Sequence, residues 1–163
     1  MILSGILMFT YNEKLFSVLY FWAIAGVSQA LITPNLGNYG PYHFRFYQFT
    51  FGHIGVILVI FFILWVKEFK ISYKDIYISL KYLCYFSFGV LVFNFITGAN
   101  YLYLMEPPAV GSLLDLFPKF PWNLPVIFII ALVYFHIAYF PFVLQSVIKK
   151  IGNGESLLGE LTD

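Results

Sequence analysis

The sequence predicts an all-α protein, a polytopic bundle of transmembrane helices with four full spans and an N-terminal half-span. Its 163 residues are 61% hydrophobic and only 10% charged, whereas soluble domains carry roughly 25% charged residues. Four stretches have the length of about 20 mostly apolar residues that a spanning helix needs. A soluble globule of this size cannot bury so many apolar side chains, so the surplus must face lipid. The lipid bilayer is therefore the first predicted partner.

The four predicted spans cover residues of about 15–33, 49–66, 77–97 and 123–144. The first has no charged residue and stops at Pro34, and the second has His53 as its only ionisable group. Ser72 and Asp75 have the spacing of a helix capping box, which predicts a turn leading into the third span. The fourth contains Pro125 and Pro141, which are tolerated near the ends of a span.

The first ten residues, MILSGILMFT, are apolar but too few to cross a membrane. A helix of ten residues reaches about 15 Å, half the hydrocarbon thickness. We expect this segment to be the second half of a helix whose first half precedes Met1, with a short interfacial or re-entrant segment as the alternative. The transmembrane domain then covers residues 1–151, and residues 152–163 form a polar cytoplasmic tail.

The distribution of basic residues predicts the orientation in the membrane. Seven lysines fall on one side and only Arg45 and Lys119 on the other, and short cytoplasmic loops are the ones enriched in Lys and Arg. The seven are Lys14, Lys67, Lys70, Lys74, Lys81, Lys149 and Lys150. We therefore expect a multi-pass protein of the plasma membrane with a cytoplasmic C-terminus and with the 34–48 and 98–122 loops outside.

Composition and motifs exclude several function classes. The net charge of +1 gives no electrostatic basis for binding nucleic acid. The sequence has no CxxC, HExxH or G-x-S-x-G motif and no glycine-rich phosphate loop. No metal and no cofactor are predicted.

Three polar residues occupy one predicted layer of the bundle. Gln29, His53 and Asn94 each lie three or four residues from the outer end of a span, about 5–6 Å inside the membrane at 1.5 Å per residue. The flanking loops add further polar side chains, namely His43, Arg45, Gln48, Asn100 and Glu106. The functional interpretation is a pocket near the outer leaflet for a lipid or small polar ligand, with His53 as a base. The alternative is that these groups only bond neighbouring helices together.

A deeper pair, Cys84 and His136, lies about 10–12 Å from the predicted inner boundary. A cysteine and a histidine in contact would form a dyad for covalent acyl transfer. Cys84 lies among aromatic residues, however, where a lone cysteine more often acts as a small buried apolar residue.

The chain resembles the YwaF-type family of bacterial integral membrane proteins over residues of about 15 to 145. The segments that carry the resemblance are 21–26 (FWAIAG), 29–34 (QALITP), 43–49 (HFRFYQF) with His53, 98–105 (GANYLYLM) with Pro107, and 112–115 (SLLD). The family is also similar, more remotely, to a eukaryotic multi-pass membrane protein implicated in cysteine-dependent lipid acyl transfer.

The resemblance implies a role for His53 and places the cysteine of interest before Met1, so Cys84 does not match it. Three hypotheses stay open, and the sequence does not decide whether the protein is an enzyme. They are a YwaF-type membrane protein of uncharacterised function with a polar outer pocket, a lipid acyltransferase or hydrolase that lacks its nucleophile in this segment, and a small-solute or lipid transporter.

Overall fold

The computed structural model describes residues 1–37, 39–108 and 111–152, and within these ranges every regular element is helical. The elements are α1 (Ile2–Thr10), α2 (Glu13–Trp22), a π-helical turn η1 (Ala23–Val27), α3 (Ser28–Ile32), α4 (Phe44–Val66), α5 (Tyr73–Thr97), the short 3-10 turns η2 (Tyr101–Tyr103) and η3 (Leu113–Leu116), and α6 (Asn123–Gly152). Among the described residues, four helices are long and apolar enough to cross a membrane. The predicted fold class is confirmed.

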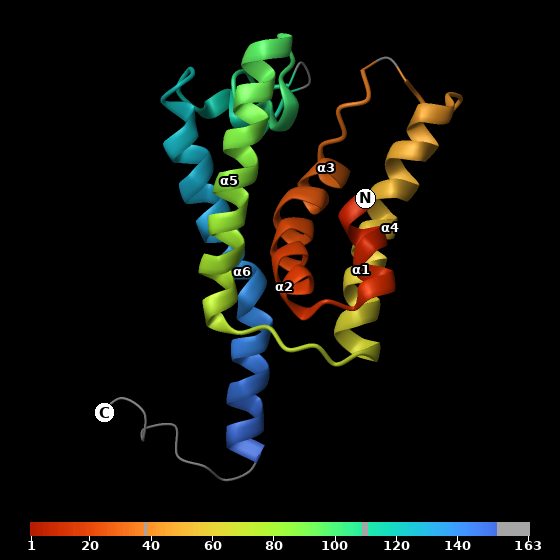
Figure 1. The fold of residues 1–163 in the computed structure, drawn as a ribbon, viewed down its shortest axis with the longest axis vertical. Coiled ribbons are helices and arrows are strands. Elements are labelled where there is room, and N and C mark those ends of the chain that lie inside the picture. The colour runs from red at the N-terminus through yellow and green to blue at the C-terminus, as the bar shows by residue number, and fades with distance from the viewer. Residues whose placement is uncertain (38, 109–110, 153–163) are drawn as a thin grey trace.

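The continuous helix from Glu13 to Ile32, made of α2, η1 and α3, lies in the middle of the bundle. Helices α1 and α4 pack on one side of it and α5 and α6 on the other, as Figure 1 shows. It is also the most buried of the four spans, with 39% of its apolar window inside the protein. The other three spans present most of their surface outward, as expected for helices that face lipid.

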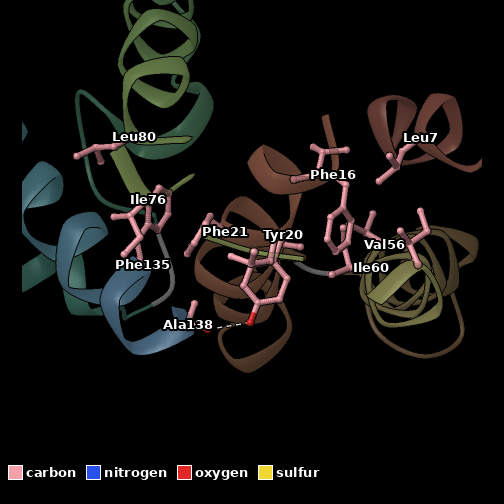
Figure 2. Close-up of a cluster of buried hydrophobic side chains, with 14 residues drawn as sticks. Leu7, Phe16, Tyr20, Phe21, Val56, Ile60, Ile76, Leu80, Phe135 and Ala138 are labelled. Carbon is pink, nitrogen blue, oxygen red and sulfur yellow. Dashed lines mark hydrogen bonds between the residues drawn. The ribbon is translucent and has the colours of Figure 1, made fainter. Parts of the chain in front are cut away.

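Aromatic side chains of α2 join the two sides of the bundle (Figure 2). Phe16 contacts the layer formed by α1 and α4, which includes Leu7, Val56 and Ile60. Phe21 lies on the other side against Phe135 of α6, with ring centroids 5.2 Å apart. Because α2 supplies both contacts, its packing positions α4 relative to α5 and α6.

Hydrogen bonds join α2 to the neighbouring helices at three points. Tyr20 Oη donates to the carbonyl oxygen of Ala138 over 2.8 Å, which Figure 2 marks with a dashed line. Trp22 Nε1 donates to the carbonyl of Ser79 over 3.2 Å, and Ser79 Oγ donates to the carbonyl of Ser17 over 3.3 Å. Such bonds between membrane helices contribute about 0.6 kcal/mol each, so they set register more than they supply stability.

The π-helical turn η1 occurs at Ala23-Ile24-Ala25-Gly26-Val27, where small residues follow one another. This turn lies against both α4 and α6. A π-turn adds one residue to the helical ladder and widens it locally. Of its five residues only Ala23 is buried.

The helices differ from the predicted spans mainly at their ends. Helix α4 begins five residues earlier than expected because His43 caps it, its Nδ1 accepting the backbone N–H of Arg45. Helix α5 begins at Tyr73 behind the predicted capping box, in which the Ser72 backbone N–H donates to Asp75 Oδ2 over 2.7 Å. Helix α6 continues to Gly152, eight residues beyond the predicted bound. The predicted tail lies almost wholly outside the described residues.

Candidate functional site

We use "outer end" for the end of the bundle that carries the 33–43 and 98–122 segments, where α3 and α5 stop and α4 and α6 begin. His53 lies in the first half of α4 and is half-buried. Its Nδ1 is 2.7 Å from the carbonyl oxygen of Phe49, and its ring lies 4.1 Å from the Phe49 ring. Because a carbonyl can only accept, this contact requires a proton on Nδ1, and in the neutral ring the lone pair is then on Nε2.

Arg45 lies two turns before His53, at the exposed start of α4. Its guanidinium carbon is 5.2 Å from the centre of the Tyr39 ring, and Tyr39 in turn contacts His43 with ring centroids 4.2 Å apart. Arg45, Phe49 and His53 follow one another at intervals of four residues, so they share one side of α4. Gln48 is also exposed and lies one turn beyond Arg45.

The N-terminal segment packs beside this part of α4. A Cβ at Gly52, the residue before His53, would meet the Sδ atom of Met1, which is the end of a flexible and exposed side chain. Helix α1 therefore lies against α4 close to His53. The sequence offered no sign of this contact, since neither residue is polar.

Gln29 lies on α3 and bonds to α6. Its Nε2 donates to the hydroxyl oxygen of Tyr134 over 2.7 Å. This bond joins the central helix to α6 just inside the outer end of the bundle. Tyr134 was not among the predicted polar residues because a tyrosine in an apolar run gives no signal of a partner.

Asn94 and Asn100 bind the loop that follows α5. Asn94 is fully buried, and its side chain makes two bonds to Tyr101, donating to the carbonyl over 3.0 Å and accepting the N–H over 2.9 Å. Asn100 donates to the carbonyl of Glu106 over 2.8 Å and accepts the N–H of Met105 over 3.1 Å. These amides replace the regular hydrogen bonds that the backbone loses where the helix ends.

Two further asparagines hold the same loop. Asn123, at the start of α6, donates to the carbonyl of Leu104 over 2.8 Å, and Asn35 donates to the Tyr103 hydroxyl over 2.8 Å. The loop needs such support because Leu102 adopts φ 59° and Tyr103 φ 50°, which side chains other than glycine rarely do. The Oδ1 atom of Asn123 is buried without a hydrogen-bond partner among the described residues.

Cys84 and His136 do not form a dyad. The Nδ1 atom of His136 lies 2.8 Å from the Leu132 carbonyl, and its Nε2 lies 3.3 Å from the hydroxyl of Tyr73, the first residue of α5. Cys84 is exposed and lies further along α5, about 16 Å from Tyr73 at 1.5 Å per residue. The prediction assumed that α5 starts near Tyr77 and α6 ends near Leu144, whereas both helices are longer.

The hydrogen bonds of the described residues join none of Gln29, His53 and Asn94 to another. Helix α4 and helix α5 lie on opposite sides of the central helix (Figure 1), so His53 and Asn94 belong to different sides of the bundle. That His53, Gln29, Arg45, Gln48, Asn94 and Asn100 line one pocket stays a prediction. Within the described residues, no group of three His, Cys, Asp or Glu side chains could hold a metal ion.

Comparisons with known proteins place the chain in a family. The family profile described as the TMEM164 family matches residues 1–139. No curated protein and no solved structure matches the chain.

Proposed function

Because this chain belongs to the TMEM164 family, we propose that this multi-pass membrane protein binds a phospholipid at the outer end of α4 and takes part in lipid acyl transfer. The observation that carries the proposal is the hydrogen bond from His53 Nδ1 to the Phe49 carbonyl. In the neutral ring this bond leaves the Nε2 lone pair free, on a half-buried side chain inside a candidate membrane span. Ionisable groups at such depth are costly and are typical of functional sites.

The charge of Arg45 supports a phospholipid as the ligand. A guanidinium pairs with phosphate through parallel hydrogen bonds, and Arg45 lies at the exposed start of the helix that carries His53. With the phosphate at Arg45, the ester bonds of the same lipid lie deeper in the membrane, toward His53. Gln48 extends this polar edge by one turn.

In the proposed reaction His53 acts as a general base. A nucleophile attacks the ester carbonyl and gives its proton to Nε2, and the histidine returns that proton to the departing lysolipid oxygen. The resemblance implies a cysteine as the nucleophile, and Cys84 does not match that cysteine. Gln29, Asn94 and Asn100 would then fix the surrounding helices and loop rather than touch the reacting atoms. The finer assignment to a bacterial YwaF type, in the plasma membrane with a cytoplasmic C-terminus, stays a prediction.

In the test, the chromosomal gene for this protein is replaced by genes for its variants, and the amounts of the phospholipid and lysophospholipid species in the cells are measured. We expect His53→Ala to abolish the change in lipid species that the wild type causes, at unaltered protein level, because losing a general base costs about 100-fold or more in rate. His136→Ala is the matched control, since His136 makes the same bond to the carbonyl four residues earlier but lies away from Arg45.

Two results would contradict the proposal. Unchanged lipid species in His53→Ala cells, together with a lower melting temperature of the purified variant, would give His53 a purely structural role. Substrate flux into proteoliposomes without any covalent change in lipid would favour the transporter hypothesis instead.

A further inference from the structure

The hairpin before α4 holds two aromatic rings close to Arg45. Its last turn closes with a hydrogen bond from the His43 N–H to the Gly40 carbonyl over 3.0 Å, and Pro41 occupies the second position of this turn, where proline is favoured. The Tyr39 ring contacts the His43 ring, with centroids 4.2 Å apart, and lies 5.2 Å from the guanidinium carbon of Arg45. Tyr39, His43 and Arg45 therefore form one group, which we call the hairpin cluster.

The hairpin cluster presents hydrogen-bond donors. Nδ1 of His43 accepts the backbone N–H of Arg45 over 3.1 Å, so in the neutral ring the proton is on Nε2, which is left to donate. The Arg45 guanidinium carries N–H donors and no acceptor. All three residues of the hairpin cluster are exposed, so these donors are accessible to a ligand. A group rich in acceptors and negative charge, such as a phosphate, suits them.

No carboxylate balances the positive charge of this hairpin. The chain has no Asp or Glu between Glu13 and Glu68, a stretch that includes the hairpin and all of α4. The acidic residues of the outer end, Glu106 and Asp115, lie in the segment that joins α5 to α6. Among the described residues, neither of them forms an ion pair with Arg45. A positively charged headgroup amine would therefore find no counter-charge here, whereas an additional negative charge would be attracted.

Tyr39 does not offer its ring to the ammonium group of a choline headgroup. Proteins bind quaternary ammonium groups over the faces of aromatic rings, but the guanidinium of Arg45 already lies over this ring. A second cation beside Tyr39 would be repelled by Arg45. The contact instead restricts the long Arg45 side chain before a ligand arrives, which lowers the entropy cost of binding. Tyr39 is thus a positioning residue for Arg45.

We propose that the hairpin cluster selects phospholipids whose headgroup carries a net negative charge, such as phosphatidylglycerol, over zwitterionic ones, such as phosphatidylcholine. The phosphate accepts hydrogen bonds from Arg45 and His43, and the rest of the headgroup lies in a region without acidic side chains. This inference rests on the proposed function and names its substrate class, because the same lipid would extend along α4 toward His53.

The test measures binding of single lipids to the purified protein in a nonionic detergent by native mass spectrometry. Phosphatidylglycerol and phosphatidylcholine with the same acyl chains are the two probes. We expect the wild type to bind phosphatidylglycerol about fivefold more tightly, the effect of one favourable exposed charge interaction. Tyr39→Ala should lower this preference to less than about twofold, because Arg45 loses its support. Tyr39→Phe keeps the ring and should keep the preference.

A second pair of variants tests the position of the charge. His43→Asp keeps a side-chain acceptor that can cap α4 and places a carboxylate beside Arg45, so it should abolish the preference for phosphatidylglycerol. Tyr42→Asp is the matched control, since it adds the same charge at a fully exposed neighbouring position and should keep most of the preference. An equal loss in His43→Asp and Tyr42→Asp would show that only the total charge of the hairpin matters and would overturn the inference.

The remaining outcomes separate this inference from the proposed function. Equal binding of the two lipids by the wild type, with both weakened by Arg45→Ala, would overturn the headgroup preference and leave the lipid site at α4 in place. Binding of both lipids that Arg45→Ala does not weaken would overturn the site as well. Displacement of phosphatidylglycerol by an excess of inorganic phosphate would identify a soluble phosphate as the ligand and would also overturn the inference.

Discussion

At the scale of single residues, asparagine amides hold the outer loop after α5. Asn94, Asn123 and Asn35 reach it from three other segments, Asn100 lies in the loop itself, and their amides bond mostly to backbone groups. An amide can donate and accept at once, so one Asn can replace both halves of a lost backbone pair. The loop can therefore keep left-handed residues at Leu102 and Tyr103.

We predict that Asn94→Ala lowers the stability of the protein in detergent by about 1 kcal/mol, because its two bonds to Tyr101 are lost. The measurement is thermal unfolding followed by circular dichroism. Thr97→Val is the control, since Thr97 is exposed and its hydroxyl bonds only to residues near it in sequence, donating to the Phe93 carbonyl and accepting the Ala99 N–H. Equal melting temperatures for Asn94→Ala and Thr97→Val would show that the amide does not hold the loop.

At the scale of elements, α2 connects the two sides of the bundle through side chains that are fully buried in a protein whose other helices are largely exposed. We predict that Phe16→Ala costs about 3 kcal/mol of unfolding free energy, because the cavity it leaves lies between α2 and α4. Phe88→Ala removes the same ring from α5, where it is 68% exposed, and should change stability by less than about 0.5 kcal/mol. Unfolding in mixed micelles with a denaturing detergent measures both, and similar losses for the two variants would refute the central position of α2.

Hydropathy predicted that each of the four spans exists. It did not predict the residues at which each helix begins and ends, or which helices pack against one another. Hydropathy falls at Gln145, yet the backbone of α6 stays helical to Gly152, because Gln and Lys are good helix formers and a fall in hydropathy does not end a helix. The depth of Gln29, His53 and Asn94 was calculable from helical rise alone. Their partners, Tyr134, the Phe49 carbonyl and the Tyr101 backbone, depend on packing between helices and on local backbone geometry that periodicity does not specify.

At the scale of the whole molecule, the distribution of lysines predicts which loops lie on the cytoplasmic side of the membrane. In a Cys84→Ser background we predict that Tyr42→Cys on the outer hairpin reacts with a membrane-impermeant maleimide in intact cells, because Tyr42 is fully exposed there. Lys70→Cys, in the exposed turn between α4 and α5, should react only after the membrane is permeabilised, since lysine-rich loops stay in the cytoplasm. The reverse pattern of labelling would invert the orientation.

The central claim is that a phospholipid binds where Arg45 and His53 share one side of α4. It is tested most directly by a phospholipid with a photoreactive diazirine next to its ester bond, incorporated into the native membrane and cross-linked to the protein. Mass spectrometry of the peptides should find adducts concentrated between Phe49 and Ile57, and Arg45→Ala should reduce them at least fivefold while Lys119→Ala does not. Adducts spread evenly over the exposed faces of α4, α5 and α6, and unaffected by Arg45→Ala, would show only the lipid that surrounds any membrane protein and would contradict the claim.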